Sequence, residues 1–334
     1  MKAILIGFGF LGRHLIETVH GKREELGKVV KDFKLVGVGE IDGYAYNEKG
    51  LSLEKLSSIK KLSDYPKDFL KGKTSVELIE KCEADLLIEA TPTNIVNGEP
   101  GLTHIEKALA EGMHVVTSNK GPMVVAFKKL TDLAKKKGCE LKYEATVAGA
   151  IPVFSLVETC LQGDKILKIS GILNGTSNYI LSRMYFEGTS FEMALREAQE
   201  RGITERDPSY DIDGIDAASK VVILANALMN KNVKFGDVER VGIRRITPEA
   251  VSLAKKAGYA IKLIGMINET LEVAPKLIPE DHPLCVHGTL NALHFETDLA
   301  REITIIGHGA GKETVSAMMN DIISVAKTAL GRID

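Results

Sequence analysis

The sequence predicts an α/β protein with two domains, and three observations lead to this prediction. Short apolar runs alternate with amphipathic stretches through the first half of the chain, a pattern typical of a parallel sheet with helices on both faces. A glycine-rich turn follows the first apolar run directly. After about Val147 the segments become longer. We therefore expect a doubly wound parallel sheet and then an α+β domain.

The first domain is expected to contain five short apolar strands. They cover residues 2–6, 35–38, 86–90, 114–117 and 140–144. The third is a continuous apolar run, as expected of a central strand buried on both faces. A helix is predicted to open at Thr103, because Thr103 and Glu106 form a capping-box pattern, and another runs from Val124 to Lys137.

The second half predicts a strand near residues 166–173, helices near 190–201 and 214–228, and further strands after Tyr259. A last helix begins near Thr314, with apolar residues at helical spacing. It can return to the first domain. We therefore assign residues 1–147, completed by 308–334, to the first domain and residues 148–307 to the second domain.

Composition excludes several classes of protein. The 334 residues include 43 basic and 45 acidic side chains, so no excess of positive charge is available for nucleic acid. No apolar run approaches the length of about 20 residues that spans a bilayer, and we expect a cytoplasmic protein. The four cysteines form no C-x-x-C pair and are expected to be buried free thiols. The histidines lack metal-ligand spacing and are expected at the surface or at helix ends.

The glycine-rich turn has the pattern G-x-G-x-x-G between a strand and a helix, which indicates a Rossmann-type dinucleotide site. The first glycine permits the turn, the second lets backbone amides approach the pyrophosphate, and the third allows close packing of the helix on the strand. The helix N-terminus then faces the phosphates. The expected cofactor contacts in this turn are Gly7, Phe8, Gly9, Phe10, Leu11 and Gly12.

Polar residues after the other strands complete the expected cofactor site. Glu40 follows the second strand and can accept hydrogen bonds from the adenosine ribose. Its carboxylate would repel a 2′-phosphate, which favours NAD as the cofactor. Lys49 or Lys55 could nevertheless accommodate the 2′-phosphate of NADP. The alternative is that Glu40 is an ordinary solvated acid in a loop and has no role in binding. The ends of the next two strands carry the remaining candidates: Thr91, Pro92, Ser118, Asn119 and Lys120.

Several segments resemble homoserine dehydrogenase, an enzyme that interconverts L-homoserine and L-aspartate 4-semialdehyde. They are GFGFLG from Gly7, EATPTN from Glu89, HVVTSNKGP from His114, YEATVAGAIPV from Tyr143, ILNGTSNYIL from Ile172 and ITERDPSYDIDGIDAASK from Ile203. The last is long and highly specific. The chain ends soon after the helix near Thr314, so the resemblance implies a short form without a C-terminal ACT domain.

The resemblance implies that residues 1–147 with 308–334 bind NAD(P), that residues 148–307 are the substrate-binding, catalytic and dimerisation domain, and that particular residues have defined roles. Lys120 and Lys220 correspond to catalytic lysines, with Asp216 as the acid beside Lys220. The implied substrate-binding residues are Glu205, Asp211, Thr176 and Lys120. The implied ligands of a monovalent cation, Na⁺ or K⁺, are backbone carbonyls of Glu144, Val147, Gly149 and Ile151.

Two positions make the match less complete. Ile203 stands where some members place a tyrosine, so that substrate contact is not expected here. The GHGAGKET segment resembles the family's glycine-rich return to the cofactor domain but is shorter by one residue, which leaves Gly309 as a weaker candidate for contacting the cofactor.

The predicted chemistry requires a positioned base, because the hydroxyl proton must leave as hydride is transferred. Asp216 and Lys220 are four residues apart on a predicted helix and share one face. Either Lys220 or Lys120 could carry the proton if its pKa is lowered by burial or a nearby cation. By spacing alone, Asp216 and Lys220 could equally form a surface pair. A calcium loop is excluded, since Lys220 occupies the position of the required glutamate.

Two other functions remain open at this point. One is a different Rossmann dehydrogenase acting on another small amino or hydroxy acid, and the other is a dinucleotide sensor without catalysis, in which Lys120 and Lys220 would be dispensable. For the leading hypothesis we expect NAD or NADP as cofactor and a small-molecule substrate. Apolar strands in the second domain predict at least a homodimer.

Overall fold

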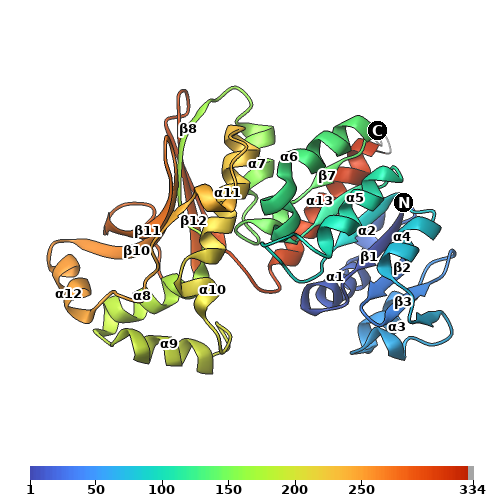
Figure 1. Ribbon diagram of the computed structural model, residues 1–334, viewed down its shortest axis with the longest axis horizontal. Coiled ribbons are helices and arrows are strands. Elements are labelled where there is room, and N and C mark those ends of the chain that lie inside the picture. Colours follow the sequence, from blue (N-terminus) through green and yellow to red (C-terminus); the bar gives the residue numbers. More distant parts are fainter. Residues whose placement is uncertain (330–334) are drawn as a thin grey trace. The chain divides into compact units, whose positions relative to one another are not determined.

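The computed structural model describes residues 1–329, and residues 330–334 lie outside the described part. The chain folds as two compact units, whose elements are labelled in Figure 1. The first unit contains Met1–Gly149 and the segment from Gly311 onward, and the second contains Ala150–Ala310. The boundaries expected from the sequence, at residues 147 and 308, differ from these by two and three residues.

The first unit is built on a seven-stranded sheet with the strand order β4-β3-β2-β1-β5-β6-β7. Its strands are β1 (Lys2–Ile6), β2 (Lys34–Glu40), β3 (Gly43–Tyr46), β4 (Phe69–Lys71), β5 (Leu86–Glu89), β6 (His114–Thr117) and β7 (Leu141–Lys142). β1, β2, β5, β6 and β7 run parallel, which confirms the predicted fold class. β3 and β4 form an antiparallel extension at one edge that the sequence prediction lacks.

Helices surround this sheet, and the last of them returns from the far end of the chain. They are α1 (Phe10–Gly21), α2 (Arg23–Val29), α3 (Leu53–Ser58), α4 (Ser75–Lys81), α5 (Gly101–Ala110), α6 (Lys120–Lys137) and α13 (Thr314–Ala329). Met318 and Ile322 of α13 belong to the same buried cluster as Leu5 and Leu15. α13 therefore completes the core of the first unit.

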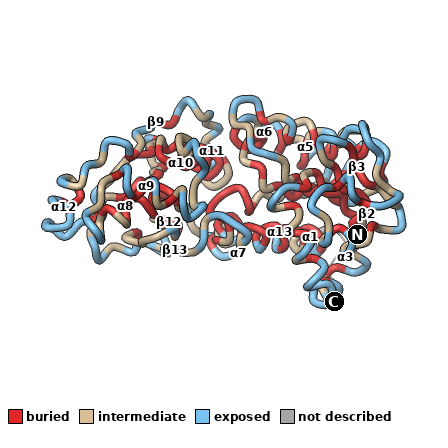
Figure 2. The backbone as a smooth tube through the Cα atoms, turned by 90° about the horizontal axis from the view of Figure 1, so that it is seen from below, coloured by how far each residue is buried: buried red, intermediate tan, exposed pale blue. Residues whose placement is uncertain are grey.

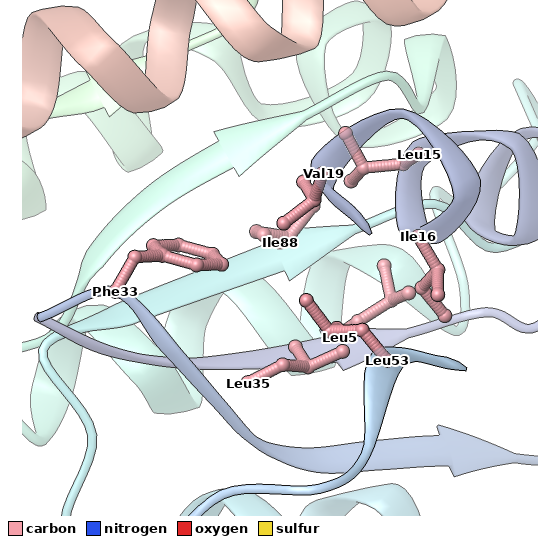
Figure 3. Close-up of a pocket in the computed structure, with 8 residues that line it drawn as sticks. All are labelled: Leu5, Leu15, Ile16, Val19, Phe33, Leu35, Leu53 and Ile88. Carbon is pink, nitrogen blue, oxygen red and sulfur yellow. The ribbon is translucent and has the colours of Figure 1, made fainter. Parts of the chain in front are cut away.

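A small apolar pocket lies between α1 and the sheet (Figure 3). Its lining is Leu5, Leu15, Ile16, Val19, Phe33, Leu35, Leu53 and Ile88. None of these side chains carries a polar group that could bind a phosphate or ribose. We therefore assign the pocket to the hydrophobic core rather than to a ligand site.

The second unit contains a six-stranded sheet with the order β13-β12-β8-β10-β11-β9. Its strands are β8 (Ile166–Ile172), β9 (Glu239–Arg240), β10 (Tyr259–Ile267), β11 (Leu271–Pro279), β12 (Leu290–Thr297) and β13 (Glu302–His308). Neighbouring strands are antiparallel except β9 and β11. This sheet is the expected second layer of an α+β domain.

The helices of the second unit are α7 (Val153–Cys160), α8 (Gly175–Glu187), α9 (Phe191–Glu200), α10 (Ser209–Ile212), α11 (Ile215–Met229) and α12 (Pro248–Lys256). α12 is largely exposed, whereas α11 is buried from Asp216 to Asn226 (Figure 2). A Cβ at Gly265 of β10 would lie 2.8 Å from the Val221 side chain, so glycine lets α11 approach the sheet closely. None of the described helices is long and apolar enough to cross a membrane.

Two expectations about helices are wrong. The helix predicted to open at Thr103 begins instead at Gly101, because Glu99 supplies the capping carboxylate: it accepts hydrogen bonds from the Thr103 N–H and hydroxyl. α8 is missing from the sequence prediction. Asn174 caps its start by accepting a hydrogen bond from the Ser177 N–H at 2.8 Å.

The expectations about histidines and cysteines also need correction. His104 and His294 are buried, because α5 and β12 turn these side chains away from solvent. The cysteines are free thiols, but only Cys82 is fully buried and Cys160 is exposed, since it lies at the end of α7.

Candidate cofactor and substrate sites

The glycine-rich turn has the geometry that a dinucleotide pyrophosphate requires. Gly7 has a φ of 107°, which favours glycine, and a Cβ at Gly12 would lie 1.9 Å from the Gly7 carbonyl oxygen. A Cβ at Gly9 would meet nothing within 4 Å, so this position faces open space. Among the described side chains, none caps the start of α1, and its first amide groups can therefore receive an anion.

The bulky residues of the turn differ in their placement. Phe8 is 2% exposed and belongs to the core, so only its backbone can contact a cofactor. Phe10 is 53% exposed and stands at the first position of α1 beside the His14 ring. Leu11 packs against the same core as Phe8. The turn therefore presents mainly backbone groups and the Phe10 ring.

Glu40 is the last residue of β2, the strand next to β1. Its Oε2 accepts a hydrogen bond from the Leu62 N–H at 3.3 Å, which fixes the carboxylate beside the edge of the sheet. The carboxyl ends of parallel strands are where ribose-binding acids lie in this class of fold. This position suits the ribose role expected from the sequence.

The candidates after β5 and β6 are brought together, because these strands pair with Glu89 opposite Thr117. Asn119 donates from Nδ2 to the Thr91 hydroxyl at 3.1 Å and to the Pro92 carbonyl oxygen at 3.3 Å. The Ser118 N–H donates to the Glu89 carbonyl oxygen at 3.0 Å. These residues form one hydrogen-bonded edge beside the glycine-rich turn.

Sequence reasoning missed the carboxylate at the centre of this edge. Glu89 is 0% exposed and accepts hydrogen bonds from the Thr91 N–H at 3.1 Å, the Thr91 hydroxyl and the Thr117 hydroxyl. His104 Nδ1 lies 3.6 Å from Glu89 Oε1. The signal was present, since an acid at the end of a continuous apolar strand must find buried partners.

Lys120 is the first residue of α6 and is partly buried. Asn119 caps this helix by accepting a hydrogen bond from the Gly121 N–H at 3.0 Å. The same asparagine therefore contacts the residues after β5 and holds the backbone that carries Lys120. The lysine belongs to the first unit.

In the second unit, Lys220 and Asp216 form a buried pair on α11 rather than a surface pair. Lys220 Nζ lies 2.7 Å from Asp216 Oδ2 and 2.5 Å from the Leu173 carbonyl oxygen. Their side chains are 7% and 8% exposed. A buried pair is stable only if further hydrogen bonds replace the lost water.

Asn174 supplies such a bond and joins the pair to a second acid. Its Nδ2 donates to Asp216 Oδ2 at 3.0 Å and to Asp211 Oδ1 at 2.7 Å. The Thr204 hydroxyl donates to Asp211 Oδ2 at 2.9 Å. Asn174 was missed from the sequence, although its place before Gly175 marks it as a helix cap. Lys220, Asp216 and Asp211 thus belong to one network.

The other predicted substrate residues lie around this network. Thr176 is 7% exposed and donates from its hydroxyl to the Ile203 carbonyl oxygen at 3.3 Å. The backbone carbonyl of Ile203 thus holds Thr176, although the isoleucine side chain lacks the hydroxyl with which a tyrosine could bind substrate. Glu205 is exposed in the loop before α10, and its carbonyl oxygen accepts a hydrogen bond from Gln199 Nε2 at 3.4 Å. The structure does not bring the Glu205 side chain into the network.

The predicted cation ligands are divided between the units. Glu144, Val147 and Gly149 belong to the first and Ile151 to the second. The Glu144 N–H donates to Asp321 Oδ2 of α13 at 3.0 Å, which anchors the start of this stretch. Across residues 1–329, no group of three or more His, Cys, Asp or Glu side chains is arranged to hold a metal ion.

Gly309 follows β13 in the second unit. A Cβ here would lie 2.1 Å from Asn291 Cγ, so the buried asparagine requires glycine at this position. The absence of a side chain at Gly309 makes room for Asn291. A contact between Gly309 and the cofactor stays a prediction.

Comparisons with known proteins agree with both halves of this description. A model described as the homoserine dehydrogenase NAD-binding domain matches residues 7–144, and one described as homoserine dehydrogenase matches residues 152–323. A homoserine dehydrogenase of Methanocaldococcus jannaschii is 46% identical over 97% of this chain and 98% of its own length.

Solved structures of similar proteins share the fold. A homoserine dehydrogenase from Thiobacillus denitrificans has a TM-score of 0.85 at 30% identity, over 99% of this chain and 74% of that one. A hyperthermophilic archaeal homoserine dehydrogenase in complex with NADPH has a TM-score of 0.83 at 28% identity, over 100% of this chain and 99% of that one.

Proposed function

The chain belongs to the homoserine dehydrogenase family, and we propose that it interconverts L-homoserine and L-aspartate 4-semialdehyde with NAD or NADP. The observation that carries this proposal is the buried Asp216–Lys220 pair, hydrogen-bonded to Leu173 and Asn174. We further propose that the reaction serves the branch from aspartate to threonine, methionine and isoleucine.

When bound, the nicotinamide accepts the hydride that leaves the homoserine hydroxymethyl carbon. The amides at the start of α1 and the open space at Gly9 suit its pyrophosphate. Glu40 suits the ribose hydroxyls and would repel a 2′-phosphate. We therefore propose NAD as a cofactor at least as good as NADP.

Lys220 is proposed to carry the proton. In the oxidation, Lys220 releases its own proton to solvent and then accepts the proton of the substrate hydroxyl, while the C–H bond breaks as hydride, so that a carbonyl forms. In the reduction, the ammonium returns the proton and stabilises the developing alkoxide. Asp216 and the Leu173 carbonyl oxygen orient Nζ at 2.7 and 2.5 Å, and burial strengthens this electrostatic effect.

The substrate ammonium needs a counter-charge, and we assign this role to Asp211 and Glu205. Asp211 is held by Asn174 and Thr204, so its carboxylate is preorganised. Glu205 is exposed and can turn towards a ligand. Thr176 is proposed to line the same pocket. Replacing either acid with alanine should raise KM for homoserine more than it lowers kcat.

Lys120 is proposed as the second catalytic lysine, carried by the first unit at the start of α6. A cation there is proposed to stabilise the developing alkoxide. We also propose that Na⁺ or K⁺ binds the carbonyls of Glu144, Val147, Gly149 and Ile151. Comparing thermal stability and rate in potassium, sodium and choline chloride tests this cation site.

The assembly is proposed to be a cytoplasmic homodimer or higher homo-oligomer. Leu167, Leu277 and Ile306 lie on three strands of the second sheet and are 48%, 58% and 51% exposed. Apolar side chains exposed on one sheet are candidates for burial against a second copy. Light scattering after size-exclusion chromatography measures the oligomeric state, and a monomer at assay concentration would contradict this proposal.

The decisive experiment follows absorbance of the reduced nicotinamide as L-homoserine is added to the protein with NAD or NADP. We expect homoserine-dependent reduction and, in the reverse direction, oxidation with aspartate 4-semialdehyde. A protein that binds the cofactor but catalyses neither direction would be a dinucleotide sensor. A rate that is higher with another small hydroxy acid would redirect the substrate assignment.

A further inference from the structure

Glu89 at the end of β5 carries a fully buried carboxylate that the reaction proposed above does not use. Burying a carboxylate costs several kcal/mol unless its hydrogen bonds are replaced. The hydrogen bonds that compensate here come from residues at the cofactor edge. Which group donates and which accepts in these bonds affects Asn119, the residue that caps α6.

The hydroxyl groups of Thr91 and Thr117 both donate their hydrogen bonds to the Glu89 carboxylate. The Thr91 hydroxyl donates to Oε1, and the Thr117 hydroxyl donates to Oε2 at 3.3 Å, because an ionised carboxylate can only accept. Each hydroxyl oxygen then has only acceptor capacity left. Asn119 supplies the donors: its Nδ2 lies 3.1 Å from the Thr91 oxygen and its N–H 3.0 Å from the Thr117 oxygen.

This order of donors fixes the orientation of the Asn119 carboxamide. With Nδ2 directed at Thr91, its Oδ1 is turned to accept the Gly121 N–H at 3.0 Å, which caps α6. If Oδ1 and Nδ2 exchanged places, two donors would meet at Gly121 and two acceptors at Pro92. The Gly121 N–H and the Pro92 carbonyl oxygen already favour this orientation, and Glu89 reinforces it through the Thr91 hydroxyl.

Close packing leaves the cap little freedom to adjust. A Cβ at Gly101 would lie 2.6 Å from Asn119 Nδ2, and a Cβ at Gly121 would lie 2.4 Å from the Asn94 carbonyl oxygen. The backbone of Lys120 lies between Asn119 and Gly121, so it is held on both sides. Any reorientation of Asn119 must move the first turn of α6.

We propose that Glu89 is a positioning residue for the reaction: through Thr91, Thr117 and Asn119 it fixes the start of α6 and thereby the place of Lys120. This inference rests on the catalytic role proposed for Lys120. A displacement of a catalytic group by about 1 Å can cost about 100-fold in rate. Glu89 itself is too deeply buried to contact substrate.

The central variant is Glu89→Gln, which keeps the shape but turns one carboxylate oxygen into a donor. One threonine hydroxyl then loses its acceptor, so the bonds that tie Asn119 to Thr91 or Thr117 are weakened. We expect kcat to fall about 10- to 100-fold, and the dissociation constant of NADH, measured by its fluorescence, to change by a smaller factor than kcat does.

Thr117→Val is a milder variant that keeps Glu89 and removes one hydroxyl, and it should lower kcat in the same direction. Thr131→Val is the matched control: this hydroxyl bonds only to carbonyls of its own helix, Phe127 and Lys128, and kcat should stay at the wild-type value. Thermal unfolding and NADH binding establish that each variant is folded.

A double-mutant cycle separates positioning from a general structural role. If Glu89 acts through Lys120, adding Glu89→Gln to Lys120→Ala should lower kcat by no more than about twofold beyond Lys120→Ala alone. Full additivity, or a loss of NADH binding as large as the loss of kcat, would overturn the inference. Wild-type protein without homoserine-dependent turnover would instead overturn the proposed function, so the two failures are distinguishable.

Discussion

Replacing Lys220 with methionine tests the buried pair most directly, because methionine keeps much of the volume and removes the ammonium. Lys220 Nζ donates to Asp216 and to Leu173, and both side chains of the pair are less than 9% exposed. Positioned proton transfer contributes about 10²- to 10⁴-fold to a rate. We expect kcat to fall on that scale in Lys220→Met, while NADH still binds.

The same change should also destabilise the protein. Removing one partner of a buried ion pair costs about 3–5 kcal/mol, because the other charge is left uncompensated. Asn174 still donates to Asp216 at 3.0 Å, so we expect the lower end, about 3 kcal/mol. Urea denaturation of the folded variant measures this value, and steady-state reduction of NAD with homoserine measures the rate.

A second variant separates chemistry from stability. Lys220→Met combined with Asp216→Asn removes both charges, so much of the lost stability should return while turnover stays low. The control is Lys128→Met, which breaks a lysine–aspartate pair of the same spacing whose side chains are 64% and 62% exposed, and it should change neither quantity measurably. Recovery of kcat together with stability in the double variant would refute a chemical role for Lys220.

Three further predictions concern the cofactor turn, the choice of cofactor and pH. The Gly9→Ala protein should fold normally but bind NAD more weakly. The Gly12→Ala protein should unfold or lose NAD binding altogether, because the new Cβ would lie 1.9 Å from the Gly7 carbonyl oxygen. Equal thermal stability of the two variants would contradict this prediction. Because Glu40 should repel a 2′-phosphate, kcat/KM with NAD should at least match that with NADP, and a preference for NADP above about 100-fold, or about 2.7 kcal/mol, would remove its assigned role. Burial lowers the pKa of Lys262 to about 8 from its ordinary 10.5, so between these values the unfolded chain binds the proton more tightly. The free energy of unfolding should therefore rise with pH there, by at most about 1.4 kcal/mol per unit, relative to Lys262→Met; parallel pH profiles of the two proteins would show that Lys262 is not the cause.

Local sequence features predicted the parallel strands and the glycine-rich turn of the first unit, but not the β3–β4 extension. The alternation of apolar and amphipathic segments predicts the parallel sheet, and the first and third glycines of the G-x-G-x-x-G turn, Gly7 and Gly12, stand where a Cβ cannot fit. These features depend on residues close together in the chain, where periodicity and turn chemistry operate. The long segment from Ile203 likewise indicated the family before any contact was known, because its spaced charges are specific.

Only the tertiary structure decided which of the candidate side chains are buried and joined. Asp216 and Lys220 have the spacing of an ordinary surface pair, and their burial follows from the close approach of α11 to β10 at Gly265. Glu89 meets Thr117 because β5 and β6 are neighbours in register, and Asn174 meets Asp211 across 37 residues of chain. Strand order and register bring such distant groups together, and the energy of a polar group depends on the partners and water around it rather than on its neighbours in sequence.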